Sequence, residues 1–207
     1  MKPGCSWFGP EVTHFITTQR EVWLTIDDGP FGEASLQLSA ALRDRRVRAT
    51  FFCKGVSLLA QPGTAHSLLA AGHTLANHTH THPSAIFWCL WPWSLRAEIA
   101  NCSAALQSVG ASPQRWFRSP VGLKHAHLAP TLKRLGLRLI AWDVRGRDGI
   151  TCEPELVLRR VLEAVKPGGI IVLHEGRPRS IESILNVVDT LQARGYTFTI
   201  PSDDNLR

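Results

Sequence analysis

The sequence predicts an α/β fold, a distorted (β/α) barrel with about seven parallel strands. Short runs rich in β-branched residues alternate with helical runs along nearly the whole chain, which is typical of repeated βαβ units. Polar side chains follow five of the predicted strands. Because barrels gather their chemistry at the carboxyl ends of the strands, this convergence favours a barrel over an open sheet.

The individual elements follow from these runs in chain order. Residues 22–26 (Val-Trp-Leu-Thr-Ile) form the first expected strand, and 33–45 form a helix whose basic end suits the helix dipole. The further expected strands are 48–52, 73–77, 115–118, 137–142, 169–173 and 196–200, and the further helices are 64–71, 94–109, 127–135, 154–166 and 180–193. Four helical runs end in a glycine before a strand, as left-handed caps do: Gly72, Gly110, Gly136 and Gly195.

The composition is that of one globular domain. The 207 residues are 44% hydrophobic and 19% charged, which is ordinary for a chain that folds around a core. No linker or low-complexity segment interrupts the pattern. We therefore expect residues 21–207 to form the domain and residues 1–20 to be an N-terminal extension.

Charge and cysteine content limit the partners and the compartment. The net charge of +6 favours an anionic partner, but the densest basic run is explained by its place at a helix end, and nucleic acid is not expected. The five cysteines form no C-x-x-C pair, which indicates reduced thiols. The N-terminus lacks the apolar core of a secretory signal and no stretch resembles a membrane span. We expect a cytoplasmic protein, with the inner membrane face as a peripheral location.

Two adjacent carboxylates, Asp27 and Asp28, end the first expected strand before a Gly-Pro turn. Like charges this close repel each other, and burying both costs several kcal/mol unless a cation compensates them. The alternative is an Asx turn with solvated acids. If Asp27 and Asp28 are both buried, we expect a cation beside them.

Three alternating histidines, His78, His80 and His82, follow the third expected strand. If the segment is helical, His78 and His82 share a face at the i, i+4 spacing that lets two imidazoles bind one metal. If it is extended, all three share a face. Two histidines with Asp28 leave coordination positions for water and substrate, which is typical of a catalytic metal site. A free carboxylate beside the metal then accepts a proton from water, and His174, after residues 169–173, is a candidate acid.

Five motifs in order resemble those of the polysaccharide deacetylase family, the NodB homology or carbohydrate esterase 4 group. They are residues 25–30, 78–83, 118–122, 142–148 and 172–174. The resemblance spans about residues 21–200 and implies a NodB-type barrel. It implies a metal-dependent hydrolase that removes an N-acetyl, or sometimes O-acetyl, group from an amino sugar in a glycan or glycolipid. The sequence does not distinguish acetyl from formyl as the N-acyl group that is removed.

The resemblance also implies an acid–base pair. Asp27 corresponds to the general base, and Arg118 to the residue that pairs with it. His174 corresponds to the general acid that protonates the leaving amine. Asp148 is the expected partner of His174, with Asp143 as the alternative.

A divalent metal is the implied cofactor. Asp28, His78 and His82 correspond to the ligands, and zinc is the first expectation, with cobalt, nickel and manganese as alternatives. The backbone N–H of Val121 corresponds to an oxyanion donor, with Pro120 beside it. This chain has Val121 where the family commonly has Tyr, Gly149 where Trp is common and Val172 where Leu is usual. The substrate is therefore less well predicted than the chemistry.

Residues 86–93 hold three of the seven tryptophans, Trp88, Trp91 and Trp93. In a barrel this loop lies on the active-site side, and exposed tryptophans on a basic protein are typical of an interfacial membrane contact. The alternatives are a hydrophobic lid and a dimer contact. Membrane contact favours an amino sugar on a membrane lipid as the substrate.

Two other functions fit parts of the pattern. A catalytically silent glycan- or lipid-binding barrel would retain the metal, but it has no need of His174. A metal-dependent phosphoesterase would suit the positive charge, yet such sites usually require more carboxylates to hold two metals.

Overall fold

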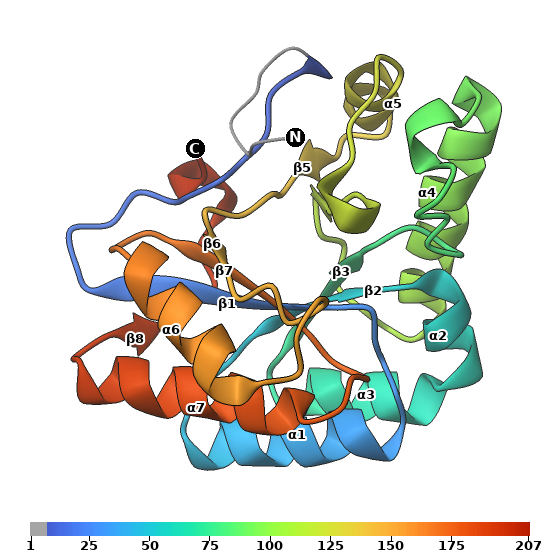
Figure 1. The fold of residues 1–207 in the computed structure, drawn as a ribbon. Helices are drawn as coiled ribbons and strands as arrows, with labels where there is room; N and C mark the ends of the chain where they lie inside the picture. The colour runs from blue at the N-terminus through green and yellow to red at the C-terminus, as the bar shows by residue number, and fades with distance from the viewer. Residues whose placement is uncertain (1–7) are drawn as a thin grey trace.

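The computed structural model describes residues 8–207, whose strands form a curled, all-parallel sheet with helices on its outer side (Figure 1). The sheet order is β5-β4-β3-β2-β1-β7-β6, and β8 pairs with the start of β1. Among the described strands, β5 and β6 are the two edges of this sheet, and they do not pair with each other. The barrel is therefore open between them. The strands are β1 (Glu21–Asp27), β2 (Thr50–Cys53), β3 (Thr74–Asn77), β4 (Trp116–Phe117), β5 (Arg138–Leu139), β6 (Val144–Arg145), β7 (Ile170–His174) and β8 (Thr197–Phe198).

The helices alternate with these strands, as the sequence predicts. They are α1 (Glu33–Asp44), α2 (Gly55–Ala60), α3 (Pro62–Ala70), α4 (Pro92–Ser108), α5 (Leu128–Arg134), α6 (Pro154–Ala164) and α7 (Ser180–Ala193). The barrel prediction is confirmed, and every expected strand and helix is present. Among the described α-helices and strands, two were missed, β6 and α2, because neither lies in a run long enough to show a β-rich or helical pattern.

The two faces of β1 explain where the core and the polar residues lie. Its even-numbered residues pack in a hydrophobic core with residues of α1, α6 and α7, among them Leu38 and Val187. Its odd-numbered residues point into the curl, because successive side chains of a strand alternate. This inner face runs from apolar Trp23 through Thr25 to Asp27, so polarity increases toward the carboxyl end of the strand.

The segment before β1 crosses the sheet on its open side (Figure 1). Val12 forms a bridge with Ile140 beside β5, and Phe15 forms one with Leu206. Both Val12 and Phe15 are buried within the core inside the curl. The described part of the expected N-terminal extension therefore packs as part of the barrel.

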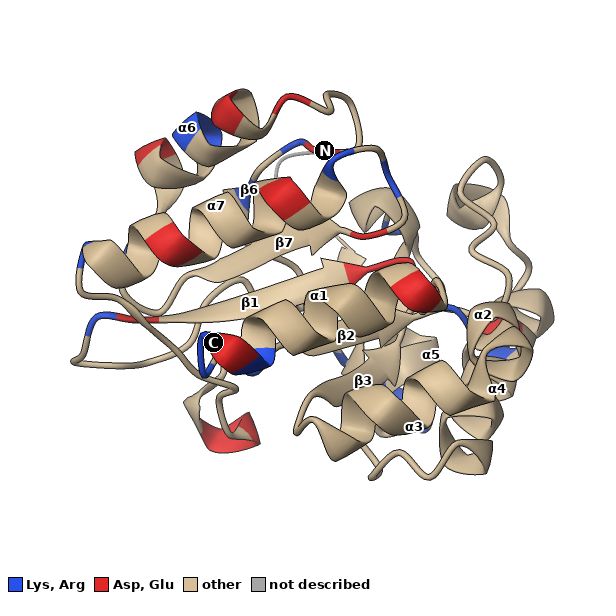
Figure 2. Ribbon diagram, turned by 90° about the horizontal axis from the view of Figure 1, so that it is seen from below, with Lys and Arg blue, Asp and Glu red and all other residues tan. Residues whose placement is uncertain are grey.

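The helical face of the molecule carries mixed charges. Figure 2 shows acidic residues at the two ends of α1 and on α6 and α7, with Lys and Arg in the middle of α6, at the end of α1 and in loops. The excess positive charge is thus not gathered along these helices. Among the described residues, no helix has the length and apolar character needed to cross a bilayer.

Candidate functional site

Asp27 forms a buried ion pair with Arg118 inside the curl, where Nη1 of Arg118 lies 2.7 Å from Oδ1 of Asp27. The guanidinium is fully buried and also donates to Oγ1 of Thr25 and to the carbonyl oxygens of Ile140 and Ala141. A buried charge is tolerated when it is paired and hydrogen-bonded in this way. Arg118 therefore fixes the orientation of Asp27 at the end of β1.

Asp28, His78 and His82 together form a cluster with the donor set of a metal site. One ligand atom from each lies within 4.8 Å of the others, and no other group of this kind occurs among residues 8–207. Nε2 of His82 lies 3.6 Å from Oδ1 of Asp28, and Nε2 of His78 lies 3.9 Å from the same atom. Two imidazole nitrogens and one carboxylate oxygen suit zinc and related divalent ions.

Both histidines of this cluster are held in the neutral form that binds metals. Burial lowers the pKa of His78 to about 4, and burial also lowers the pKa of His82. Nδ1 of His78 donates to the carbonyl oxygen of Arg118 at 2.9 Å. This bond leaves Nε2 of His78 as the free ligand atom on the side of Asp28.

The histidine segment is neither helical nor extended. Thr79 and His82 have positive φ angles of 67° and 58°. Side chains take the place of helical hydrogen bonds: Oδ1 of Asn77 accepts from the N–H of Thr79, and Oγ1 of Thr79 accepts from the N–H of His82. The helical expectation for this segment is therefore wrong, and so is the extended one. His78 and His82 nevertheless face each other, with ring centroids 4.8 Å apart, and His80 lies outside the cluster.

His174 ends β7 and lies opposite Asp27 in the register of β1 and β7. Its Nδ1 is 2.9 Å from Oδ1 of Asp148, and its backbone N–H donates to Oδ2 of Asp148 at 2.6 Å. Asp143 is engaged elsewhere, since its Oδ1 accepts from the N–H of Ile170. Of the two candidate partners, the structure thus brings Asp148 to His174.

The surroundings of His174 favour its protonated form. Burial alone disfavours the imidazolium, but the hydrogen bond and charge of Asp148 outweigh it, helped by the charges of Asp27 and Asp28. The pKa of His174 is therefore raised above its ordinary value of 6.5. An imidazolium that persists near neutral pH is suited to protonate a leaving group.

Three further residues reach this site without having been predicted: Thr25, Glu175 and Arg177. Thr25 accepts a hydrogen bond from Arg118, and Nη2 of Arg177 lies 3.6 Å from Oδ2 of Asp28. Glu175 is buried and accepts from Ser35, and burial raises its pKa to about 7. The signal that would have found Glu175 and Arg177 is their place directly after the strand that ends at His174.

The residues expected beside the substrate lie at different depths. Val121 is 55% exposed and adopts a left-handed conformation with φ 48°, which is strained for a β-branched residue. Pro120 next to it is buried. Val172 lies in the core inside the curl, and Gly149 is exposed in the loop before α6.

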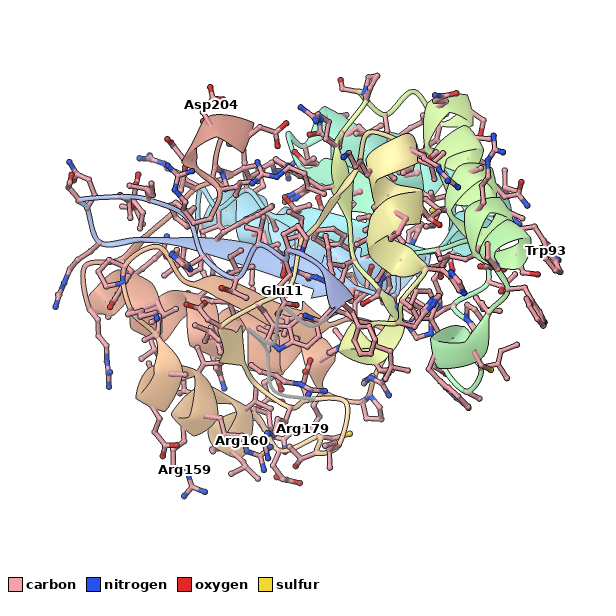
Figure 3. All side chains as sticks on the ribbon, turned by 90° about the horizontal axis from the view of Figure 1, so that it is seen from above. Glu11, Trp93, Arg159, Arg160, Arg179 and Asp204 are labelled. Atoms are coloured by element: carbon pink, nitrogen blue, oxygen red, sulfur yellow. The ribbon has the colours of Figure 1, made fainter. Side chains whose placement is uncertain are left out.

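The tryptophans of residues 86–93 are uncovered. Trp88, Trp91 and Trp93 are 61%, 65% and 68% exposed, and Ile86 is 54% exposed. The rings of Trp91 and Trp93 stack on each other at 5.2 Å. Figure 3 shows Trp93 at the outer edge of the molecule, at the start of α4. These side chains therefore do not form a closed lid over the described part of the barrel.

Comparison with known proteins decides the family. A family model described as polysaccharide deacetylase matches residues 16–140. A chitooligosaccharide deacetylase from Bradyrhizobium sp. (strain ANU 289) is 31% identical over 198 residues, which are 87% of this chain and 89% of that protein. The chain belongs to the polysaccharide deacetylase family. It is a carbohydrate deacetylase, and thus a hydrolase.

Further members of this family resemble the chain in part or in fold. The peptidoglycan-N-acetylglucosamine deacetylase PgdA of Listeria monocytogenes is 28% identical and covers 91% of this deacetylase, which spans only 39% of that protein. A family 4 carbohydrate esterase from Streptomyces lividans, solved with acetate, superimposes with a TM-score of 0.81 at 27% identity, over 90% of this chain and 95% of that chain. A pseudoenzyme of carbohydrate esterase family 4 from Bacillus anthracis, 23% identical, shares the fold with a TM-score of 0.82 over 91% of this chain and 66% of that chain.

Proposed function

We propose that this deacetylase removes an N-acetyl group, or another short N-acyl group such as formyl, from an amino sugar in a glycan or glycolipid. The names of its relatives, which act on chitooligosaccharides and on peptidoglycan N-acetylglucosamine, support an amino-sugar substrate. The observation that carries the proposal is the register of β1 and β7. It sets Asp27 opposite His174, a carboxylate and an imidazole, with the Asp28, His78 and His82 cluster beside Asp27.

The chain's own groups supply the proton transfers. Asp27, fixed by Arg118, takes a proton from the attacking water with the oxygen that does not face the guanidinium. His174 gives a proton to the leaving amine, which must depart protonated, and Asp148 holds the imidazole in place for this transfer. The two roles require opposite protonation states, and the surroundings of His174 provide the acid form.

Charge on the acyl oxygen requires stabilisation as the tetrahedral centre forms. A divalent cation held by Asp28, His78 and His82 would supply Lewis acidity, which polarises the acyl carbonyl and lowers the pKa of water. The backbone N–H of Val121 donates to the same oxygen in this proposal, as a preorganised dipole. Because a backbone donor does not depend on side-chain identity, valine in place of tyrosine preserves this role.

The test is release of acetate or formate from N-acetylated and N-formylated amino-sugar oligomers and glycolipids, before and after chelation. We expect Asp27→Asn and His174→Ala to lower kcat/KM by about 10²–10⁴. His66→Ala, an exposed histidine on α3, is the matched control and is expected to retain activity. Turnover that persists in Asp27→Asn would refute the mechanism, and no release by the unmodified protein would favour a silent binding barrel.

We propose in addition that the tryptophan surface, formed by Ile86, Trp88, Trp91 and Trp93, contacts the interfacial region of an anionic membrane. Tryptophan rings favour this region because they are apolar with one polar N–H. The net charge of +6 and the exposed Arg96, near the start of α4, suit anionic headgroups. A glycolipid substrate would then be met at the membrane surface.

Vesicle co-sedimentation tests this contact. We expect binding to vesicles with anionic phosphatidylglycerol and about tenfold weaker binding after replacement of all three tryptophans by Ser. Val56→Ser with Leu59→Ser, which alters exposed aliphatic residues on the neighbouring α2, is the control. Unchanged binding of the tryptophan variant would contradict the proposal.

A further inference from the structure

A cavity of about 680 Å³ lies at the side where the sheet is not closed, between β5 and α6. Its wall includes Val121 and Trp142, so one end adjoins the candidate active site. The other end reaches Arg160 and Glu163 of α6. This volume lies within the range of about 300–1,000 Å³ that is usual for small-molecule sites.

Three arginines line this cavity: Arg145, Arg147 and Arg160, hereafter the arginine cluster. Arg145 lies over the ring of Trp142, with Cζ 5.5 Å from the centroid, and Arg160 donates to a backbone carbonyl of residue 146. Within residues 8–207, none of the three forms an ion pair with a carboxylate. Their charges are therefore available to a ligand.

The acidic side chains of the same cavity do not neutralise this cluster. Each of them is paired with a different cation: Glu11 with Lys124 at 2.9 Å, Asp143 with Lys166 at 3.4 Å and Glu163 with Arg159 at 4.0 Å. Figure 3 shows Glu11 on the segment that crosses the sheet, and Arg159 with Arg160 on α6. The cavity thus has an unbalanced positive wall beside the candidate active site.

We propose that the arginine cluster binds an oxyanion, either a phosphate or a carboxylate, carried by the amino-sugar substrate. This inference rests on the proposed function, because it places the anion on the same molecule that is deacylated. The planar guanidinium matches both oxyanions with paired hydrogen bonds. The positive wall then draws anionic substrates to the site in preference to neutral oligomers.

Direct binding tests this inference apart from turnover, with products that the enzyme cannot deacylate. Calorimetry on the unmodified protein compares glucosamine 1-phosphate, muramic acid and neutral methyl glucosaminide. We expect at least one of the two anionic sugars to bind about tenfold more tightly than the neutral one, with the preference falling as salt rises. The two anionic arms show whether phosphate or carboxylate is preferred, and equal binding of all three sugars overturns the inference.

Matched variants assign the preference to the cavity. Arg145→Gln with Arg160→Gln is expected to reduce the preference for the anionic sugar to less than about threefold. Arg134→Gln removes an exposed arginine from the last turn of α5 that does not line the cavity, and it is expected to leave the preference unchanged. An equal loss in both variants overturns the inference. Failure of acetate release with an intact preference would instead contradict the proposed function alone.

Discussion

Asp148 contacts His174 at two points: one carboxylate oxygen lies 2.9 Å from Nδ1, and the other accepts the backbone N–H of the same residue at 2.6 Å. The side chain and the backbone of His174 are thus held by a single carboxylate. Such a contact fixes the ring so that Nε2 faces away from Asp148 and is available for proton transfer. It also places a negative charge beside the imidazolium.

Replacement of Asp148 by Asn is expected to shift the pH profile of deacylation. The pKa of His174 is raised by Asp148, so the acid form persists above pH 6.5 and is lost as pH rises further. Without that charge the pKa falls, and the alkaline limb of kcat/KM moves to lower pH. An unchanged alkaline limb in Asp148→Asn would show that His174 is not the acid.

Metal removal is expected to abolish deacylation, and addition of zinc to restore it. Since Asp28, His78 and His82 come from two loops of the folded chain, a metal binds the folded state preferentially. At about 100 times Kd, this stabilises the protein by about 2.7 kcal/mol. A thermal scan with and without zinc measures the shift in Tm. Asp28→Asn and His82→Ala are expected to lose it, whereas exposed His66→Ala retains it.

The sequence predicts the strand ends of this site well, because the signals are local. Asp27 and Asp28 follow a β-rich run, and His174 follows another, so their convergence follows from a parallel sheet. The conformation of the histidine segment was not predictable in the same way. It depends on hydrogen bonds to the side chains of Asn77 and Glu98. The carboxylate of Glu98, on α4, accepts the backbone N–H groups of His80 and Thr81 in the histidine segment.

The full burial of Arg118 and the cavity beside β5 could likewise not be predicted from the sequence. Full burial of a guanidinium requires acceptors from residues 25, 27, 140 and 141, which come together only in the curled sheet. The cavity exists because β5 and β6 do not pair, and β6 itself is too short to predict. Cytoplasmic location and membrane contact stay predictions.

Loss of the guanidinium in Arg118→Met is expected to destabilise the fold by about 3–5 kcal/mol, because it leaves Asp27 buried without a counter-charge. Urea denaturation measures this loss. The double variant with Asp27→Asn is expected to recover part of it, since the uncompensated charge is then absent. Arg45→Ala breaks the exposed pair with Asp189 and is expected to cost only about 0.2–1 kcal/mol. Similar losses in the free energy of unfolding on breaking the buried Arg118–Asp27 pair and the exposed Arg45–Asp189 pair would contradict this expectation.

Stability is expected to fall with acid partly through His73, which is buried beside β2. Its Nδ1 accepts from the N–H of Ala49, and Nε2 lies 3.1 Å from Oγ of Ser39. Burial lowers the pKa of His73 from 6.5 to about 4. As pH falls, His73 is therefore protonated in the unfolded chain before it is protonated in the folded protein. Its contribution to the free energy of unfolding is complete above pH 6.5 and is lost as pH falls toward 4. By linkage the loss is on the order of 3 kcal/mol.

The variant His73→Gln tests this pH dependence, because glutamine cannot be protonated. Between pH 7 and pH 4.5, its free energy of unfolding, measured by urea denaturation, should fall less than that of the unmodified protein. Equal falls would mean that His73 does not contribute.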